Sequence, residues 1–149
     1  MKRTILIGVV FIVGLSMAVI QNVDAQTMCQ GQAATIVGND FDNVLIGTPG
    51  NDVIHGLGGN DIIEGRNGND IICGGEGADS IFGDRGDDAI RGGPGNDNLR
   101  GNAGTDNING GDGNDILRGG AGPDLLDGGN GRDDCNRGTG NNPAALNCE

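Results

Sequence analysis

Apolar and polar positions recur with a period of nine residues from Gly47 to Asn136. Each unit has glycine at its first and fourth places, aspartate at the sixth and an apolar residue at the eighth. The glycine-rich first six residues predict a turn, and the last three predict a short strand whose middle side chain points inward. The eighth-place residues expected to form the core are Ile54, Ile63, Ile72, Ile81, Ile90, Leu99, Ile108, Leu117, Leu126 and Cys135.

Two units make one coil with a strand on each side, because the chain must turn back on itself to bury both inward side chains. Successive coils then stack about 4.8 Å apart in two parallel sheets. The sequence therefore predicts an all-β solenoid of stacked 18-residue coils, with two facing ladders of Ile and Leu in a thin core.

The sixth-place aspartates should stack along the two edges of this solenoid. One edge carries Asp52, Asp70, Asp88, Asp106 and Asp124, and the other carries Asp61, Asp79, Asp97, Asp115 and Asp133. Like charges about 5 Å apart repel strongly unless a cation lies between them. Ca²⁺ fits, because it accepts six to eight carboxylate and carbonyl oxygens in flexible geometry, whereas Mg²⁺ requires a tighter octahedron and Zn²⁺ prefers nitrogen and sulfur.

Glycines at two fixed places should expose backbone carbonyls as further ligands at these turns. The first-place glycines are Gly47, Gly56, Gly65, Gly74, Gly83, Gly92, Gly101, Gly110, Gly119 and Gly128. The fourth-place glycines are Gly50, Gly59, Gly68, Gly77, Gly86, Gly95, Gly104, Gly113, Gly122 and Gly131. With four gaps between aspartates on each edge, we expect up to about eight shared ions.

The unit Gly110–Arg118 resembles the RTX (haemolysin-type) calcium-binding nonapeptide. The resemblance implies a right-handed parallel β-roll, with Ca²⁺ held between the turns of adjacent coils. A degenerate unit precedes the array at residues 38–46, where Phe41 and Asn43 replace the fourth glycine and the aspartate. The second-place glycine is also replaced in half of the units, and the carboxylate of Asp84 could alter its site.

Four segments follow from composition and repeat boundaries. Residues 1–25 resemble a signal peptide, with a basic start, an apolar run and a small residue at Ala25, and an uncleaved membrane anchor is the alternative. Residues 26–46 should form an amino-terminal cap with the degenerate repeat, 47–136 the ten-unit calcium-binding roll, and 137–149 a carboxyl-terminal cap.

The chain is strongly acidic, with a net charge of −12, 32 glycines and only 2% aromatic residues. This charge argues against binding to nucleic acids and suits a chain that collects cations. Burial of this small apolar surface cannot offset the conformational entropy that is lost on folding. We therefore expect the chain to be largely disordered without its ligand. We expect no membrane insertion after cleavage of the signal.

Four cysteines in an exported chain predict two disulfides, for which three connectivities exist. Pairing Cys135 with Cys148 would tie down the tail and leave Cys29 to Cys73, where an amino-terminal cap could reach the outward ninth place. The alternative leaves Cys135 as a buried free thiol. Cys29, the run from Ala34 to Gly38, and the final Cys148-Glu149 also resemble small secreted proteins made wholly of these repeats.

The sequence predicts a secreted, extracellular calcium-binding protein that folds when it meets external Ca²⁺. The alternative is a Ca²⁺-cemented structural or adhesive component of a surface layer, matrix or filament. An apolar strip at Val53, Ile71 and Ala89 could contact a cell-surface partner or another copy, or it could pack under the amino-terminal cap. Irregular fifth places disfavour ice binding, and a single histidine, His55, far from the only mature serine, predicts no enzyme.

Overall fold

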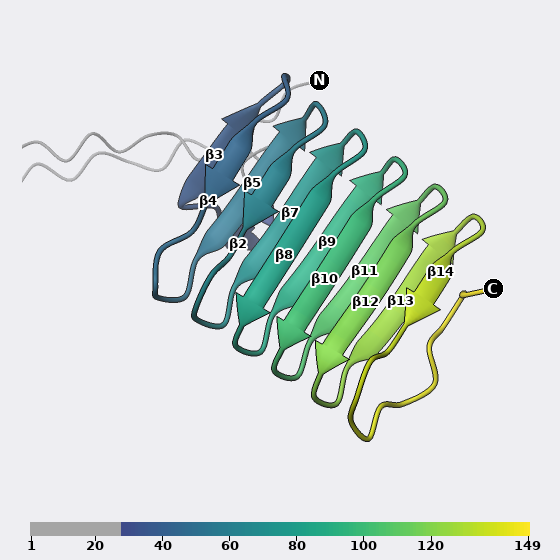
Figure 1. Cartoon of the computed structure of the whole chain (residues 1–149). Coiled ribbons are helices and arrows are strands. Elements are labelled where there is room, and N and C mark those ends of the chain that lie inside the picture. The colour runs from purple at the N-terminus through teal and green to yellow at the C-terminus, as the bar shows by residue number, and fades with distance from the viewer. Residues whose placement is uncertain (1–27) are drawn as a thin grey trace, which may run out of the picture.

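The computed structural model describes residues 28–149, and this part of the chain consists of strands and turns without a helix. Strands alternate along the chain between two six-stranded parallel sheets that stack as coils (Figure 1). The odd-numbered sheet contains β3 (Ile36–Asn39), β5 (Val53–Gly58), β7 (Ile71–Glu76), β9 (Ala89–Pro94), β11 (Asn107–Asp112) and β13 (Leu125–Asn130). The even-numbered sheet contains β4 (Val44–Ile46), β6 (Ile62–Glu64), β8 (Ser80–Arg85), β10 (Asn98–Ala103), β12 (Ile116–Ala121) and β14 (Asp134–Asn136).

The register between neighbouring strands is 18 residues, so equivalent places of every second unit lie above one another. Leu99, for example, pairs with Ile81 on one side and Leu117 on the other. The expected all-β solenoid of stacked 18-residue coils is therefore confirmed. Between residues 28 and 149 there is no helix long and apolar enough to cross a membrane.

The strands are longer than the three residues per unit that the sequence pattern indicates. Most span six residues, and β7 continues through Gly74 into the first part of the next turn. Backbone hydrogen bonds also join the stacked turns, as from Arg85 N to Arg66 O at 2.8 Å and from Gly77 N to Pro94 O at 3.0 Å. Identical turns in exact 18-residue stacking can pair their backbones just as strands do, which extends the ladders beyond the apolar residues.

The eighth-place aliphatic residues form the core, as expected. Nine of them are at most 1% exposed: Ile54, Ile63, Ile72, Ile81, Ile90, Leu99, Ile108, Leu117 and Leu126. Ile36, Leu45, Cys135 and Ala145 pack against this cluster at its ends and are only partly buried. Such a thin core supplies little apolar burial for each coil, so the turns must contribute to stability as well.

A small hairpin covers part of the outer face of the odd-numbered sheet. It consists of β1 (Met28–Cys29) and β2 (Gln32–Ala33), which pair antiparallel, and β1 lies against β5 and β7. The Cys29–Cys73 disulfide joins it to β7, and Gln30 Nε2 donates a hydrogen bond of 3.2 Å to the Ala89 carbonyl. The apolar strip of Val53, Ile71 and Ala89 lies on β5, β7 and β9 and is half-buried, in keeping with packing under the cap.

At the other end, residues 137–142 continue the repeat before the chain leaves it. Thr139 pairs with Ala121, and Asn142 occupies the place of the next aspartate, where its Oδ1 accepts a hydrogen bond from Asp124 N. The remaining tail returns across the last coil, with Leu146 N bonded to Leu126 O at 2.8 Å and Cys148 bonded to Cys135. An eleventh, degenerate unit therefore lies within the segment assigned from the sequence to the cap.

Candidate metal centre

The sixth-place aspartates form two ladders, one along each edge of the solenoid. In each ladder the carboxylate Oδ1 accepts a hydrogen bond from the backbone N–H of the aspartate one coil earlier, as from Asp70 N to Asp88 Oδ1 at 2.8 Å. The donor–acceptor pairs are Asp52–Asp70, Asp61–Asp79, Asp70–Asp88, Asp79–Asp97, Asp88–Asp106, Asp97–Asp115, Asp106–Asp124 and Asp115–Asp133. Each carboxylate is thereby fixed in one orientation against the preceding turn.

Neutral amides stand at one end of each ladder. Asn43 N donates to Asp61 Oδ1 at 2.7 Å, so the degenerate first unit joins the ladder without adding a charge. Asn142 does the same at the opposite end by accepting from Asp124 N. The degenerate units therefore continue the backbone stacking while limiting the rows of negative charge.

The second carboxylate oxygen, Oδ2, is buried and lacks a hydrogen-bond partner in nine of the ten aspartates. These are Asp61, Asp70, Asp79, Asp88, Asp97, Asp106, Asp115, Asp124 and Asp133, each at most 2% exposed. An unpaired carboxylate oxygen in such surroundings is costly, because it has lost water without gaining a donor or a counter-charge. These oxygens are therefore suited to a cation.

Asp52 is the exception among the ten. Its Oδ2 accepts hydrogen bonds from both the backbone N and the Oγ1 of Thr48, the latter at 3.0 Å. Asp52 is also the most exposed of the set, at 8%. The aspartate nearest the amino-terminal end of its ladder is thus partnered within its own turn, which leaves it less available to a cation than the others.

The first-place glycines line the space into which Oδ2 points. A Cβ added to Gly74 would overlap Asp79 Oδ2 and would also crowd the carbonyl oxygen of Gly92, at 2.9 Å. The same pair of oxygens, one carboxylate and one carbonyl from the next coil, meets at Gly56, Gly65, Gly83, Gly92 and Gly110. Glycine is required there because a side chain would fill the cradle, and carboxylate and carbonyl oxygens are the ligands Ca²⁺ takes in proteins.

The expected metal ligands do not gather as a cluster of side chains. In residues 28–149 no group of three or more His, Cys, Asp or Glu side chains is placed to hold a metal. Main-chain carbonyls must therefore complete any ion's coordination, and a hard cation with oxygen ligands fits better than Zn²⁺.

Burial raises the pKa of eight ladder aspartates, most of all at the centre of the roll: Asp61, Asp70, Asp79, Asp88, Asp97, Asp106, Asp115 and Asp124. Burial is the largest cause, neighbouring carboxylates add to it, and the backbone hydrogen bond opposes it. The pKa of Asp88 and Asp97 is raised to about 7, and that of Asp79 and Asp106 to about 6. Calcium must therefore compete with protons at these positions near neutral pH.

Acid should stabilise the metal-free roll. Because these pKa values are raised above 3.8 on folding, the stability they contribute is fully present below pH 3.8 and is lost as pH rises through 6 to 7. In a calcium chelator, lowering the pH from about 8 to about 4 should increase the β-sheet circular dichroism signal. In calcium, the same acidification should weaken metal binding. A chelated chain that gains no structure in acid would contradict this prediction.

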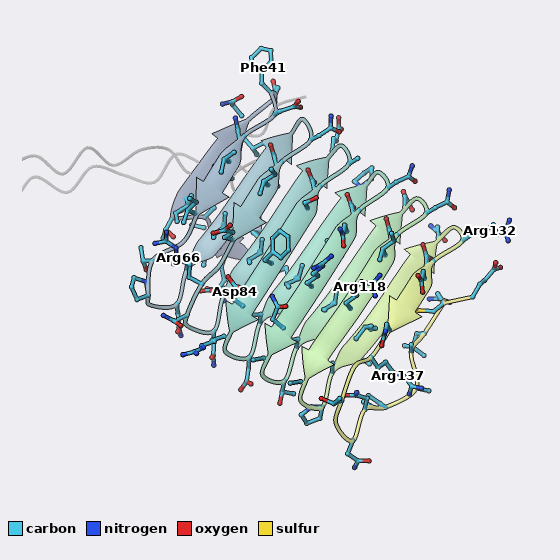
Figure 2. The ribbon with its side chains drawn as sticks, viewed as in Figure 1. Phe41, Arg66, Asp84, Arg118, Arg132 and Arg137 are labelled. Atoms are coloured by element: carbon cyan, nitrogen blue, oxygen red, sulfur yellow. A yellow bond between two sulfur atoms is a disulfide. The ribbon has the colours of Figure 1, made fainter. Side chains whose placement is uncertain are left out.

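Four of the five second-place residues that replace glycine adopt an unusual backbone conformation, Thr48 being the exception. Leu57, Arg66, Asp84 and Asn102 all have φ between 76° and 80°, so the turn keeps its shape at a cost in strain. Arg66 and Asp84 project from the same edge of the roll (Figure 2), and Asn102 Nδ2 donates to Asp84 Oδ1 at 3.1 Å. The Asp84 carboxylate also helps to raise the pKa of Asp70 and Asp88, so it adds negative charge near their sites.

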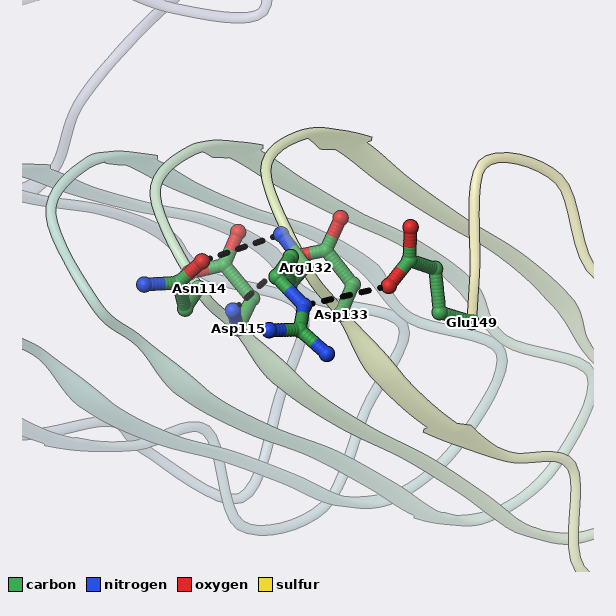
Figure 3. A network of polar contacts seen from close by, with 5 residues as sticks. All are labelled: Asn114, Asp115, Arg132, Asp133 and Glu149. Carbon is green, nitrogen blue, oxygen red and sulfur yellow. Dashed lines mark hydrogen bonds and ion pairs between the residues drawn. The ribbon is translucent and has the colours of Figure 1, made fainter.

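Fifth-place polar side chains form a second, outer ladder, which the sequence pattern did not reveal. Asn51 Oδ1 accepts from Asn69 N at 2.9 Å, and Asn69 Oδ1 accepts from Asp87 N at 3.0 Å. In the last coils, Arg132 N bonds to Asn114 beside the Asp115–Asp133 link, and Arg132 Nε lies 3.2 Å from Glu149 Oε2 (Figure 3). The recurrence of Asn, Asp and Thr at this place was the available signal, and it serves backbone pairing between turns.

Comparison with known proteins places this geometry in a family. No curated protein and no solved structure matches the chain. The model of the RTX calcium-binding nonapeptide repeat matches in four copies, over residues 37–72, 74–108, 82–117 and 109–142, and so covers more than half of the chain. With its glycine cradles and buried aspartate ladders, the chain belongs to the family of RTX calcium-binding nonapeptide repeats.

Proposed function

We propose that this chain is a secreted calcium-binding repeat protein whose folding is driven by Ca²⁺ held between the glycine and aspartate turns of adjacent coils. The observation that carries the proposal is the set of nine buried Oδ2 atoms without a partner. All nine lie against a first-place glycine, and seven of them also meet a backbone carbonyl there, as Asp97 Oδ2 does at Gly92 with the carbonyl of Gly110. The proposed ligands are the sixth-place aspartates and the carbonyls of the glycine turns.

A bound ion would remove the main electrostatic obstacle to folding. Stacked carboxylates along each edge repel one another, and a chain with net charge −12 resists compaction. A divalent cation between two coils neutralises this charge and joins the turns that the thin core cannot hold alone. Because the site is assembled only when the coils stack, binding free energy becomes folding free energy.

Folding outside the cell follows from the affinity that such sites have. Extracellular Ca²⁺ modules bind at roughly 10⁻⁴–10⁻³ M, well above the calcium concentration inside cells. We propose that the chain is exported through the signal at residues 1–25, which lie outside the described residues. The two disulfides suit an oxidising compartment beyond the cytoplasm.

We further propose that the protein has no catalytic role. Ser80 on β8 and His55 on β5 belong to different sheets of the roll, and the ladder aspartates are engaged in backbone pairing. Two open hollows on the described surface are lined by side chains such as Gln30 and Arg91 or Arg66 and Asn102, and neither lining pairs a nucleophile with a base.

The decisive experiment is a titration of the mature chain with Ca²⁺, followed by circular dichroism, with Mg²⁺ as the control. We expect a cooperative change from coil to β-sheet in Ca²⁺ alone, and equilibrium dialysis should find up to about eight ions per chain. The gap next to Asp52 should be the weakest on its edge, since Thr48 occupies one oxygen of that carboxylate. A chain fully folded in chelator at neutral pH would overturn the proposal.

A calcium-cemented structural or adhesive component is the second candidate. It is favoured by the exposed apolar side chains of the first coil, among them Phe41 at 78% and Val44 at 66% exposure, which a purely ion-binding module does not need. Assembly that depends on protein concentration in Ca²⁺ would separate this role from simple ion binding.

A further inference from the structure

The two ends of the solenoid differ in how the described chain covers them. At the carboxyl end the tail hydrogen-bonds across the last coil, as from Gly122 N to Thr139 O at 2.8 Å and from Leu146 N to Leu126 O at 2.8 Å. The Cys135–Cys148 disulfide holds that tail in place. At the amino end, β3 and β4 each pair with a strand on one side only (Figure 1), and no other part of residues 28–149 pairs with their second edge.

Apolar side chains are concentrated at this end of the described chain. Four of the nine exposed large apolar residues of the described chain belong to the first coil: Val37, Phe41, Val44 and Ile46. Phe41 extends beyond the ribbon there (Figure 2). The end of the core is also open, because Ile36 and Leu45 pack against the buried cluster and remain partly exposed.

The edge strands are short, which limits pairing at a free edge, but they lack the charged residues and prolines that block it. Natural edges are protected by charged residues, proline, bulges or a covering segment. The strands Ile36–Asn39 and Val44–Ile46 contain neither a charge nor a proline. The amino-terminal hairpin does not cover them, since Cys29 is bonded to Cys73 in the third coil and the described chain begins there, on the outer sheet face.

We propose that the free edges of β3 and β4 bind the same edges of a second copy, giving an end-to-end dimer. Antiparallel pairing across a two-fold axis would extend both sheets and would join the two open core ends at Ile36 and Leu45. At the other end of each copy the tail bonds to β13 through Leu146, and the edge strand β14 carries the charge of Asp134, so assembly stops at two chains and does not continue as a filament. The dimer requires a folded roll, and its contacts are separate from the metal sites.

Charge does not oppose the junction. Asp40 and Asp42 lie in the exposed turn between β3 and β4, and antiparallel pairing of like strands places the turns of the two copies at opposite edges of the dimer. The dimer should therefore depend little on ionic strength. The apolar and backbone contacts of the edges remain as the source of affinity.

The test is sedimentation equilibrium of the purified full-length mature chain in saturating Ca²⁺, over a wide range of protein concentrations. We expect a reversible monomer–dimer equilibrium with no larger species. Val44→Glu, which places a charge at the edge in both copies, should raise the dissociation constant about tenfold or more. The matched control is Ile116→Glu, at the equivalent outward place on β12, where the side chain is 38% exposed, and it should leave the equilibrium unchanged.

Three results would overturn the dimer: a folded wild-type chain that stays monomeric at every concentration, growth beyond two chains, or equal weakening by Ile116→Glu. Circular dichroism in Ca²⁺ must show that each variant is folded. If Val44→Glu does not fold, Val37→Glu on β3 replaces it, and a fully dimeric Val37→Glu chain would also refute the proposal. A wild-type chain that does not fold in Ca²⁺ is a failure of the proposed calcium function, which the dichroism detects independently.

Discussion

Gly113→Ala should unfold the middle of the roll or destabilise it by roughly 3–5 kcal/mol, through strain and backbone overlap together. Gly113 has φ of 141°, a conformation that a residue with a side chain rarely adopts. A Cβ at this position would also overlap the carbonyl oxygen of Gly95 in the preceding coil. Neither Gly113 nor Gly95 can shift to relieve the overlap, because the backbone of each is hydrogen-bonded to the next coil. Urea unfolding in saturating Ca²⁺, followed by circular dichroism, measures the loss.

Gly50→Ala is the matched control, since Gly50 is also a fourth-place glycine. It lies in the first turn of the array and has no positive φ, and the nearest atom to an added Cβ is Thr48 Oγ1 at 3.8 Å. We expect a change within about 1 kcal/mol, as for an ordinary surface substitution. Equal losses at Gly50 and Gly113 would mean that the close stacking of the turns does not determine stability.

Much of this fold could be predicted from the repeat, because its period constrains both sheet and core. An uninterrupted nine-residue pattern places Ile72 above Ile54 and below Ile90, and the structure shows that register. The family resemblance led to the same architecture. The pairing of aspartates 18 residues apart also followed from the period, since identical places in alternate units must stack.

The details that the pattern did not reveal depend on single side chains or on the chain ends. The pattern did not indicate that Thr48 would donate a hydrogen bond to Asp52 Oδ2, because that contact lies within one turn and does not recur. The degenerate unit that begins at Arg137 was also missed, because Arg137 replaces its first glycine. Gly138 and Gly140 nevertheless have positive φ and preserve the turn conformation. The repeat predicts the features that every unit shares, whereas contacts at the chain ends are visible only in the structure.

The orientation of each carboxylate was also beyond the sequence. Stacked aspartates could have shared a cation symmetrically through all of their oxygens. Instead, Oδ1 of Asp97 is used by Asp79 N at 2.8 Å, and only Oδ2 remains for a cation. Backbone donors compete for the same carboxylate, and the stacking geometry decides the outcome. Because Oδ1 accepts a backbone hydrogen bond and Oδ2 is left for a cation, each such aspartate contributes both to a metal site and to the pairing of two coils.

That double role makes Asp88→Ala the second substitution with a large expected effect. Asp88 lies at the centre of its ladder, where it accepts from Asp70 N and donates its own N–H to Asp106 Oδ1 at 3.0 Å. Removing the carboxylate should damage the sites on both sides of it, so equilibrium dialysis should find about two fewer Ca²⁺ ions per chain. The calcium needed for half-maximal folding should rise in the same titration.

Asp112→Ala is the control that separates ladder position from charge. Asp112 stands at a third place, where its exposed Oδ1 accepts from Asn130 Nδ2 at 2.7 Å and makes no backbone link between aspartates. Each substitution removes one carboxylate from the same roll, so in saturating Ca²⁺, where a bound cation keeps Asp88 ionised, the change in net charge is the same. If calcium is held by the ladders, only Asp88→Ala lowers the number of ions bound. Equal stoichiometry in the two variants would mean that the carboxylates attract calcium only as a diffuse field, and the ladders would then be structural.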